Sequence, residues 1–232
     1  MLLFQISFIF VEMKIDKTPF MYGQIVDNTY FVNRQKELHK FQLELTSGIH
    51  QIVISPRRWG KSSFVKQAAN NLKSNEKIVF IFIDLFSIRT EREFFETISK
   101  QIISSTYNTF DEVRTILSKL LSSLTPKISL SPDPTQNIEI DFNWKSKTES
   151  IAEILNLAEK IAEKKKIRII MCFDEFQNIA NFTESKSFQK LLRSYWQKHK
   201  HVTYCLYGSN RSMMEEMFQK QIYSSCLSHN QQ

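Results

Sequence analysis

Four short apolar runs separated by helical segments constrain the fold of this chain more than any other feature. The runs are residues 50–55 (HQIVIS), 77–86 (KIVFIFIDLF), 167–173 (IRIIMCF) and 202–207 (VTYCLY). The second run is apolar almost throughout, which is typical of a strand covered on both faces of a parallel sheet. Strands that alternate with helices predict an α/β fold with a doubly wound parallel sheet.

Apolar residues at helical spacing mark the segments between these runs. The first segment, residues 31–48, can begin at the capping residue Asn33 and end at Gly48 in a left-handed conformation. Further stripes with this spacing lie within residues 64–72, 94–120, 148–165 and 188–196.

Residues 127–142 depart from this pattern. Their apolar residues switch to period two on either side of a Pro-Asp-Pro turn. Such alternation is typical of half-buried strands, so we expect a β-hairpin inserted between helices.

Composition bounds the class of protein. A chain of 232 residues with 42% hydrophobic residues can fill the core of one large domain, or of a domain and a half. Its formal net charge of +7 fits a protein that binds an anionic nucleotide. The same charge allows weak, sequence-independent contact with nucleic acid.

The cysteines and histidines give little support for a metal site or a disulfide framework. Cys172, Cys205 and Cys226 lack C-x-x-C spacing, and the first two lie inside apolar runs, as expected in a reducing cytoplasm. His199 and His201 form a close pair without an obvious third ligand, so either a metal site or a solvated helix end fits them.

The first dozen residues are largely apolar but too few to span a bilayer, which takes about 20 residues. They lack the basic start and the cleavage site of a signal peptide. We therefore expect a cytoplasmic protein with no membrane segment, in which residues 1–17 are an extension and Met1 or Met13 is the start.

The segment ISPRRWGKSS, residues 54–63, connects the first strand to the following helix. Gly60, Lys61 and Ser62 match the end of the phosphate-loop pattern G-x-x-x-x-G-K-[ST], but Ser55 replaces the first glycine. Backbone N–H groups and a helix N-terminus surround a phosphate in such a loop, while the lysine adds charge and the hydroxyl contacts Mg²⁺. Ser55 is tolerable there if its backbone angles are ordinary. The alternative is a capped strand-to-helix turn with an exposed lysine.

Polar residues also follow two later strands. Asp174 and Glu175 end the run IRIIMCF, where one carboxylate can hold Mg²⁺ through water and the other can deprotonate an attacking water. Ser209 and Asn210 follow VTYCLYG and can reach the γ-phosphate or that water. The alternatives are a surface acidic pair without a role and a simple turn. With only 4 glycines in the chain, Gly60 and Gly208 at strand ends also suggest places where a ligand approaches.

These motifs together resemble a known family. The segments SPRRWGKSS, FDEFQ and YGSN, preceded by TPFMYGQIVDNTYFVNRQKEL, are similar to prokaryotic ATPase domains of the STAND class, which are relatives of AAA+ ATPases and origin-recognition initiators. The resemblance covers about residues 18–220, which we take as one domain, and implies a P-loop NTPase fold of the AAA+-like type with ATP and Mg²⁺ as its cofactors.

The resemblance also implies roles for particular residues. Asp174 becomes the Walker B metal residue together with Ser62, Glu175 becomes the catalytic base, and Ser209 or Asn210 becomes the sensor. The implied nucleotide-binding residues are the loop residues Ser55, Pro56, Arg57, Arg58, Trp59, Gly60, Lys61, Ser62 and Ser63, with Phe31, Val32 and Arg34 beside the adenine.

Two departures from the family pattern qualify this expectation. Ser55 replaces the glycine, and residues 221–232 form a short polar tail where family members continue into a further strand and a lid. We therefore expect an ATP-binding core that hydrolyses Mg-ATP slowly as a switch, with an open last strand suited to self-association or a protein partner. The alternative is a non-catalytic nucleotide-binding interaction module, or a truncated remnant of such an ATPase.

Overall fold

A computed structural model of the chain describes residues 34–107, 109–120, 124–130, 138–144 and 147–217. Helices and strands alternate over most of this length. In chain order they are α1 (Gln35–Thr46), β1 (Gln51–Ile54), α2 (Lys61–Leu72), β2 (Ile78–Asp84), α3 (Glu91–Thr106), α4 (Phe110–Leu120), β3 (Leu124–Leu130), β4 (Ile138–Trp144), α5 (Lys147–Leu155), α6 (Leu157–Lys165), β5 (Arg168–Asp174), the 3₁₀ helix η1 (Phe176–Asn181), α7 (Ser185–Trp196) and β6 (Val202–Gly208).

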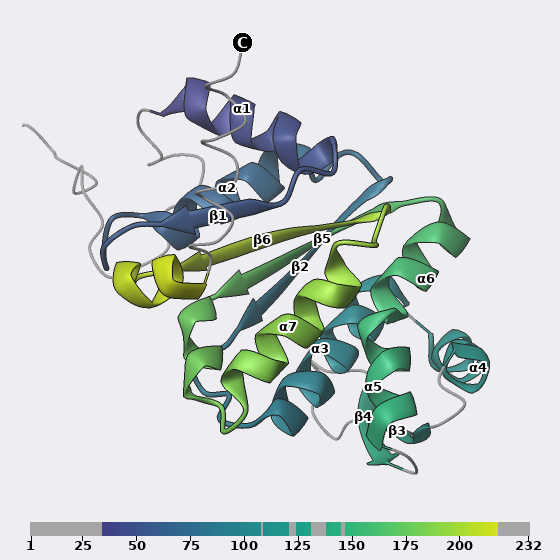
Figure 1. Cartoon of the computed structure of the whole chain (residues 1–232). Coiled ribbons are helices and arrows are strands. Elements are labelled where there is room, and N and C mark those ends of the chain that lie inside the picture. The colour runs from purple at the N-terminus through teal and green to yellow at the C-terminus, as the bar shows by residue number, and fades with distance from the viewer. Residues whose placement is uncertain (1–33, 108, 121–123, 131–137, 145–146, 218–232) are drawn as a thin grey trace, which may run out of the picture.

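Four parallel strands form the central sheet in the order β1-β6-β5-β2 (Figure 1). The register places Cys172 opposite Cys205 and Asp84 opposite Asp174. Because all four strands run the same way, their carboxyl ends meet at one edge of the sheet. The predicted parallel α/β sheet is confirmed.

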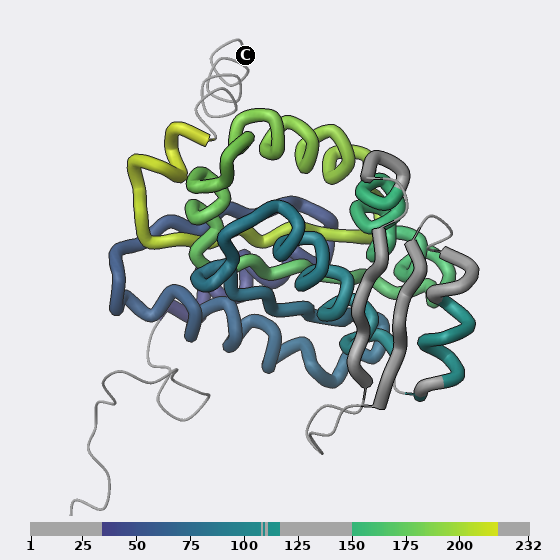
Figure 2. Tube along the Cα trace, turned by 90° about the horizontal axis from the view of Figure 1, so that it is seen from below, coloured from purple at the N-terminus to yellow at the C-terminus, as the bar shows by residue number. Residues whose placement is uncertain are grey.

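Helices cover both faces of this sheet. In Figure 1, α1 and α2 lie on one face, while α3, α6 and α7 lie on the other. Figure 2, seen from below, looks onto the layer of α3 and α7. Each layer closes a separate apolar core, one built around Leu38, Leu45 and Phe64 and the other around Phe94, Phe173 and Phe188. The doubly wound arrangement is therefore confirmed.

The position of the last strand differs from the sequence-based expectation. We expected β6 to be the open edge of the sheet, but it lies between β1 and β5 and all of its residues are buried. The edges are β1 and β2, and Ile52 of β1 is 40% exposed. The apolar run at residues 50–55 is therefore only partly buried, since an edge strand has a neighbour on only one side.

Two predicted helical segments are each divided in the structure. Residues 94–120 form α3 and α4, and residues 148–165 form α5 and α6. The second break falls at Asn156, whose side-chain Nδ2 donates to the Ala152 carbonyl 2.8 Å away. The Asn156 backbone N–H shares this carbonyl at 3.2 Å, and apolar periodicity does not reveal a side chain that bonds the preceding turn in this way.

The ends of the elements follow the sequence signals in part. Gly48 ends the first helical segment in the left-handed region, with φ of 89°. The residue before α1 is Arg34, which has φ of 70° and provides no side-chain cap, while Asn33 lies outside the described residues. Strands β3 and β4 pair antiparallel as the predicted hairpin, although its Pro-Asp-Pro turn also lies outside them. None of the described helices is long and apolar enough to cross a bilayer.

The histidine pair belongs to a hydrogen-bond network at the amino edge of the sheet. Glu159 of α6 accepts bonds from the backbone N–H groups of Lys200, His201 and Val202, and its Oε1 lies 2.9 Å from Nδ1 of His201. His199 is half-buried, with Nδ1 2.7 Å from the Tyr204 hydroxyl. Among the described residues no group of histidine, cysteine or acidic side chains is arranged to hold a metal. The pair is structural, and for His199 neither expectation holds.

This network makes the stability of the fold depend on pH through Glu159. Burial raises the pKa of Glu159, but the backbone N–H groups of Lys200 and His201 and the His201 ring outweigh burial, so its pKa lies below its ordinary value. A carboxylate with a depressed folded-state pKa stabilises the fold above its unfolded-state pKa. This contribution is lost as the pH falls through the folded-state value.

We predict that Glu159→Gln lowers the free energy of unfolding by about 1.5–3 kcal/mol near pH 7, because a charged acceptor of several N–H groups is lost. The difference from wild type should shrink as the pH falls through the carboxyl range. Urea unfolding at a series of pH values measures both effects, with Glu163→Gln on the exposed side of the same helix as control. A difference that stays constant with pH would contradict the charged role of Glu159.

Candidate functional site

In the loop between β1 and α2, the residues with unusual backbone angles do not include Ser55. Gly60 has φ of 72° and Arg58 has φ of 67°, whereas Ser55 is not among the residues with positive φ. The Ser55 N–H lies 3.4 Å from the Gly208 carbonyl, and its Oγ is buried without a hydrogen-bond partner among the described residues. The condition for tolerating a serine at this position is met. The left-handed strain falls instead on Arg58.

A hydrogen bond connects this loop to the end of β5. Ser62 Oγ, at the start of α2, donates to Asp174 Oδ2 across 2.7 Å. The other carboxylate oxygen accepts the Glu175 N–H at 2.8 Å. Burial raises the pKa of Asp174 above its ordinary value, although the Ser62 hydroxyl and the Glu175 N–H oppose the shift. A hydroxyl beside a partly buried carboxylate is a donor set that fits Mg²⁺, which prefers oxygen ligands and would offset the cost of burying this charge.

Glu175 lies where the loop, β5 and β6 meet. Its Oε1 is 3.9 Å from Nζ of Lys61, whose side chain is only 7% exposed. Its Oε2 accepts the Ser209 hydroxyl at 3.0 Å. The backbone of Glu175 is left-handed, with φ of 49° and ψ of 42°, a conformation that persists in a non-glycine residue only when its surroundings enforce it. Lys61, Ser62, Asp174, Glu175 and Ser209 thus form one cluster.

Other predicted site residues lie elsewhere or have other partners. Asn210 caps the helix over residues 211–217, since its Oδ1 accepts the Met213 N–H at 3.2 Å. The Arg34 guanidinium lies 4.7 Å from the centre of the Phe64 ring on α2. Residues 56–60 of the loop are exposed, and Ser63 is buried. Residues 31–32, placed by sequence beside the adenine, lie outside the described residues.

A glycine is needed at position 208 for a reason other than the approach of a ligand, which its position at a strand end had suggested. A Cβ built on Gly208 would lie 2.0 Å from Oε1 of Gln177. The space next to this glycine is therefore filled by the Gln177 side chain, and the expectation that a ligand approaches there is wrong.

Two polar residues at this edge were not singled out from the sequence. Gln177 donates from Nε2 to Glu175 Oε2, and Asp84 ends β2 directly opposite Asp174. Both carried a signal, because Gln177 is the last letter of FDEFQ and Asp84 follows a continuous apolar run, as Asp174 does. The strand order that brings Asp84 beside Asp174 could not be read from that signal.

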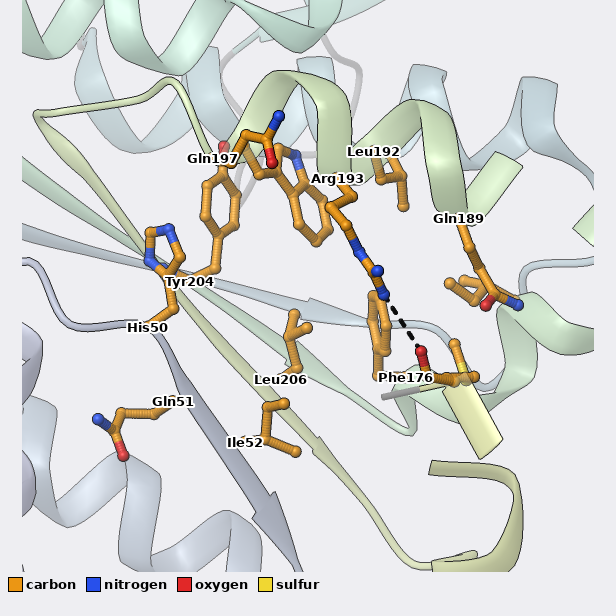
Figure 3. A pocket seen from close by; sticks show the side chains of 13 residues that line it. His50, Gln51, Ile52, Phe176, Gln189, Leu192, Arg193, Gln197, Tyr204 and Leu206 are labelled. Carbon is orange, nitrogen blue, oxygen red and sulfur yellow. Dashed lines mark hydrogen bonds between the residues drawn. The ribbon is translucent and has the colours of Figure 1, made fainter. Parts of the chain in front are cut away.

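A separate cavity of about 280 Å³ lies between the β1–β6 side of the sheet and helices η1 and α7 (Figure 3). Figure 3 shows Ile52 and Leu206 facing Leu192 and Phe176 across it, with Arg193 bonded at one end to the Met217 carbonyl, 3.3 Å away. Its lining is mostly apolar and includes none of the loop residues 55–63. The cavity is therefore not the place where the loop, Asp174 and Glu175 converge.

Comparison with known proteins agrees with this fold. A family model described as an ATPase domain predominantly from Archaea matches residues 31–230. The structure of the Walker-type ATPase PABY2304 of Pyrococcus abyssi is similar with a TM-score of 0.52 and 20% identity, over 87% of this chain and 52% of that one. The Aeropyrum pernix ORC2 protein, solved as ADPNP–ADP complexes, is similar with a TM-score of 0.50 and 14% identity, over 82% of this chain and 44% of that one.

These likenesses show the fold alone, because both identities are low. The chain spans about half the length of the solved structures it matches. None of the curated proteins compared with the chain matches it.

The strained residue of the loop gives a prediction about stability. Arg58→Gly should leave the free energy of unfolding unchanged or raise it by up to about 1 kcal/mol, because glycine removes the left-handed penalty. Arg57→Gly removes the same charge at a position without positive φ. This substitution should lower the free energy of unfolding by about 0.5–1 kcal/mol. Urea unfolding of the two variants provides the comparison. A larger loss for Arg58→Gly than for Arg57→Gly would show that the left-handed conformation of Arg58 carries no strain.

Proposed function

The chain belongs to the family of ATPase domains found predominantly in Archaea, and from this premise we propose that it binds Mg-ATP at the loop–β5 site and hydrolyses it slowly as a molecular switch. The observation that carries the proposal is the Ser62–Asp174 hydrogen bond of 2.7 Å. It joins the phosphate-loop hydroxyl to the carboxylate at the end of the apolar strand β5, which is the pairing that a bound Mg²⁺ requires.

The loop and the start of α2 would hold the phosphates. Backbone N–H groups of residues 57–63, which include the N-terminus of α2, supply donors, and the Lys61 ammonium supplies a positive charge. That charge lies 3.9 Å from Glu175, so a phosphate would take over part of its pairing. Ser62 and Asp174 would hold Mg²⁺, which when bound neutralises charge on the phosphate oxygens. Arg57 and Arg58, both exposed, add positive potential at the mouth.

The purine would lie on the Arg34 side of the loop. Arg34 packs on Phe64 of α2, so it is attached to the same helix that begins with the phosphate-binding residues. Phe31 and Val32 lie three and two residues before it in the sequence. Their proposed place beside the adenine rests on this proximity and on the family resemblance.

Glu175 would take the proton from the attacking water. Its Oε2 accepts the Ser209 hydroxyl while its Oε1 faces Lys61, so one oxygen is fixed and the other remains available toward the phosphates. We assign slow turnover because residues 56–60 are exposed in the described structure, and water-excluding closure contributes much of the rate in enzymes of this type.

The setting and the extent of the unit are also part of the proposal. We take residues 18–220 as the ATPase unit and the cytoplasm as its compartment, in keeping with the free, buried Cys172 and Cys205. Contact with nucleic acid would be weak and dependent on salt, since it would rest on the net charge of +7.

A second candidate is a nucleotide-binding interaction module that does not hydrolyse ATP. The exposure of large apolar side chains favours it, since Trp59 is 71% exposed, Phe86 is 65% exposed and Ile52 lies on the open edge strand. Such a module would associate with a protein partner or with itself when nucleotide is bound. Turnover that depends on Glu175 supports the first candidate, and nucleotide-dependent association without turnover supports the second.

The first test of the proposed function is nucleotide binding. We predict that Lys61→Ala weakens binding of a fluorescent ATP analogue at least tenfold, or about 1.4 kcal/mol, because the buried ammonium is lost. Lys73→Ala, at the exposed end of the same helix, should bind like wild type. Equal affinities of wild type and Lys61→Ala, both shown to be folded by circular dichroism, would reject the phosphate-loop assignment.

The second test is turnover. We predict that Glu175→Gln keeps its affinity for the ATP analogue but lowers kcat by about 10² or more, the usual effect of removing a positioned base. Phosphate release under steady-state conditions measures this, with Glu163→Gln as the surface control. If the variant hydrolyses ATP as fast as wild type, Glu175 is not the base.

A further inference from the structure

Gln177 holds the Glu175 carboxylate from a buried position. It is the second residue of η1 and is 5% exposed. Its Nε2 donates to Glu175 Oε2, the same oxygen that accepts the Ser209 hydroxyl at 3.0 Å. With two donors on one oxygen, the carboxylate cannot rotate without breaking both bonds. In this orientation its other oxygen, Oε1, faces Lys61.

The amide of Gln177 is fixed from its other side by the backbone of β6. A Cβ on Gly208 would lie 2.0 Å from Gln177 Oε1 and 3.1 Å from its Cδ. The φ of Gly208 is outside the left-handed range, so its backbone does not require glycine there. The side chain is absent at position 208 because the amide occupies its space, and any larger residue would displace that amide.

The hydrogen-bond state of Gln177 shows which contact determines its orientation. Its Oε1 is buried and has no hydrogen-bond partner among the described residues, a state that costs free energy. Reversing the amide would bring an acceptor against the Glu175 carboxylate, where repulsion replaces a charge-assisted bond. The amide therefore keeps its donor on Glu175 and leaves its own acceptor unsatisfied.

We propose that Gln177 is a positioning residue for Glu175, and that the Gly208 backbone holds its amide in place so that Oε1 of the base faces the phosphates. This inference rests on the proposed function, in which Glu175 is the base. It adds to that function a group that touches neither the nucleotide nor the attacking water but sets the orientation of the residue that does.

Two single variants test the inference from opposite sides. Gln177→Met keeps the size of the side chain and removes the donor, whereas Gly208→Ala keeps the amide and pushes it away. We expect each to lower kcat by about tenfold to a hundredfold, the scale of a small misplacement of a reacting group. Affinity for the fluorescent ATP analogue should stay within about twofold of wild type, because no phosphate contact is changed. A merely structural role would lower the affinity for the analogue together with kcat.

A double variant shows whether Gly208 acts through the amide. In a Gln177→Ala background the amide that would meet the new methyl group is gone, and the Met214 sulfur at 3.3 Å is its remaining neighbour. Adding Gly208→Ala there should change kcat and the urea midpoint much less than it does in wild type. In the wild-type background the same substitution should lower both. This non-additivity identifies direct coupling between the two positions.

Each other outcome leads to a definite conclusion. If Glu175→Gln loses turnover but Gln177→Met and Gly208→Ala keep wild-type kcat, the positioning role is wrong and the proposed function stands. If Gln177→Met does not fold, Gly208→Ala decides alone, and an unchanged kcat overturns the inference. If wild type hydrolyses ATP no faster than Glu175→Gln, the proposed function fails and the inference fails with it.

Discussion

The hydrogen bond from Ser62 to Asp174 is the contact on which the site depends. Its two residues belong to segments that leave the sheet from β1 and β5, which are not neighbours because β6 lies between them. The end of β6 therefore lies between the segments that follow β1 and β5, and Ser209 at that end contacts Glu175. In open α/β sheets, ligands bind outside the carboxyl ends of the strands, where loops from different strands converge in this way.

Several features that cost free energy lie at this same edge of the sheet. Lys61 and Asp174 are partly or largely buried, Arg58 and Glu175 have left-handed backbones, and Ser55 Oγ lacks a partner. The two apolar cores are built mainly from aliphatic and aromatic side chains, although the Tyr107 hydroxyl in one of them also lacks a partner among the described residues. Strain and unsatisfied groups persist when the surrounding structure over-determines them, which is common where a protein binds or reacts.

Local pattern predicted the elements of this fold but not their arrangement. Apolar runs and helical spacing located the strands, the hairpin and most helices, because both reflect side chains that face a core. The place of β6 between β1 and β5 depends on pairing between distant segments, and no residue of VTYCLY encodes it. The six-residue η1 is too short for a 3.6-residue period, so Phe176 and Gln177 could not be placed. The role of Gly208 was misread because the need for a glycine there comes from the side chain of Gln177, which follows a different strand.

The strand order also determines when the loop can be secured during synthesis. Gln51 of β1 pairs with Cys205 of β6, and β6 is the only strand beside β1 in the described sheet. As the chain emerges from the ribosome, β2 and β5 can pair first, whereas β1 waits until nearly all of the described sequence has been made. Such long-range pairing is slow because chain entropy is lost before contacts form. The phosphate loop at the end of β1 is thus among the last parts of the described fold to reach its final place.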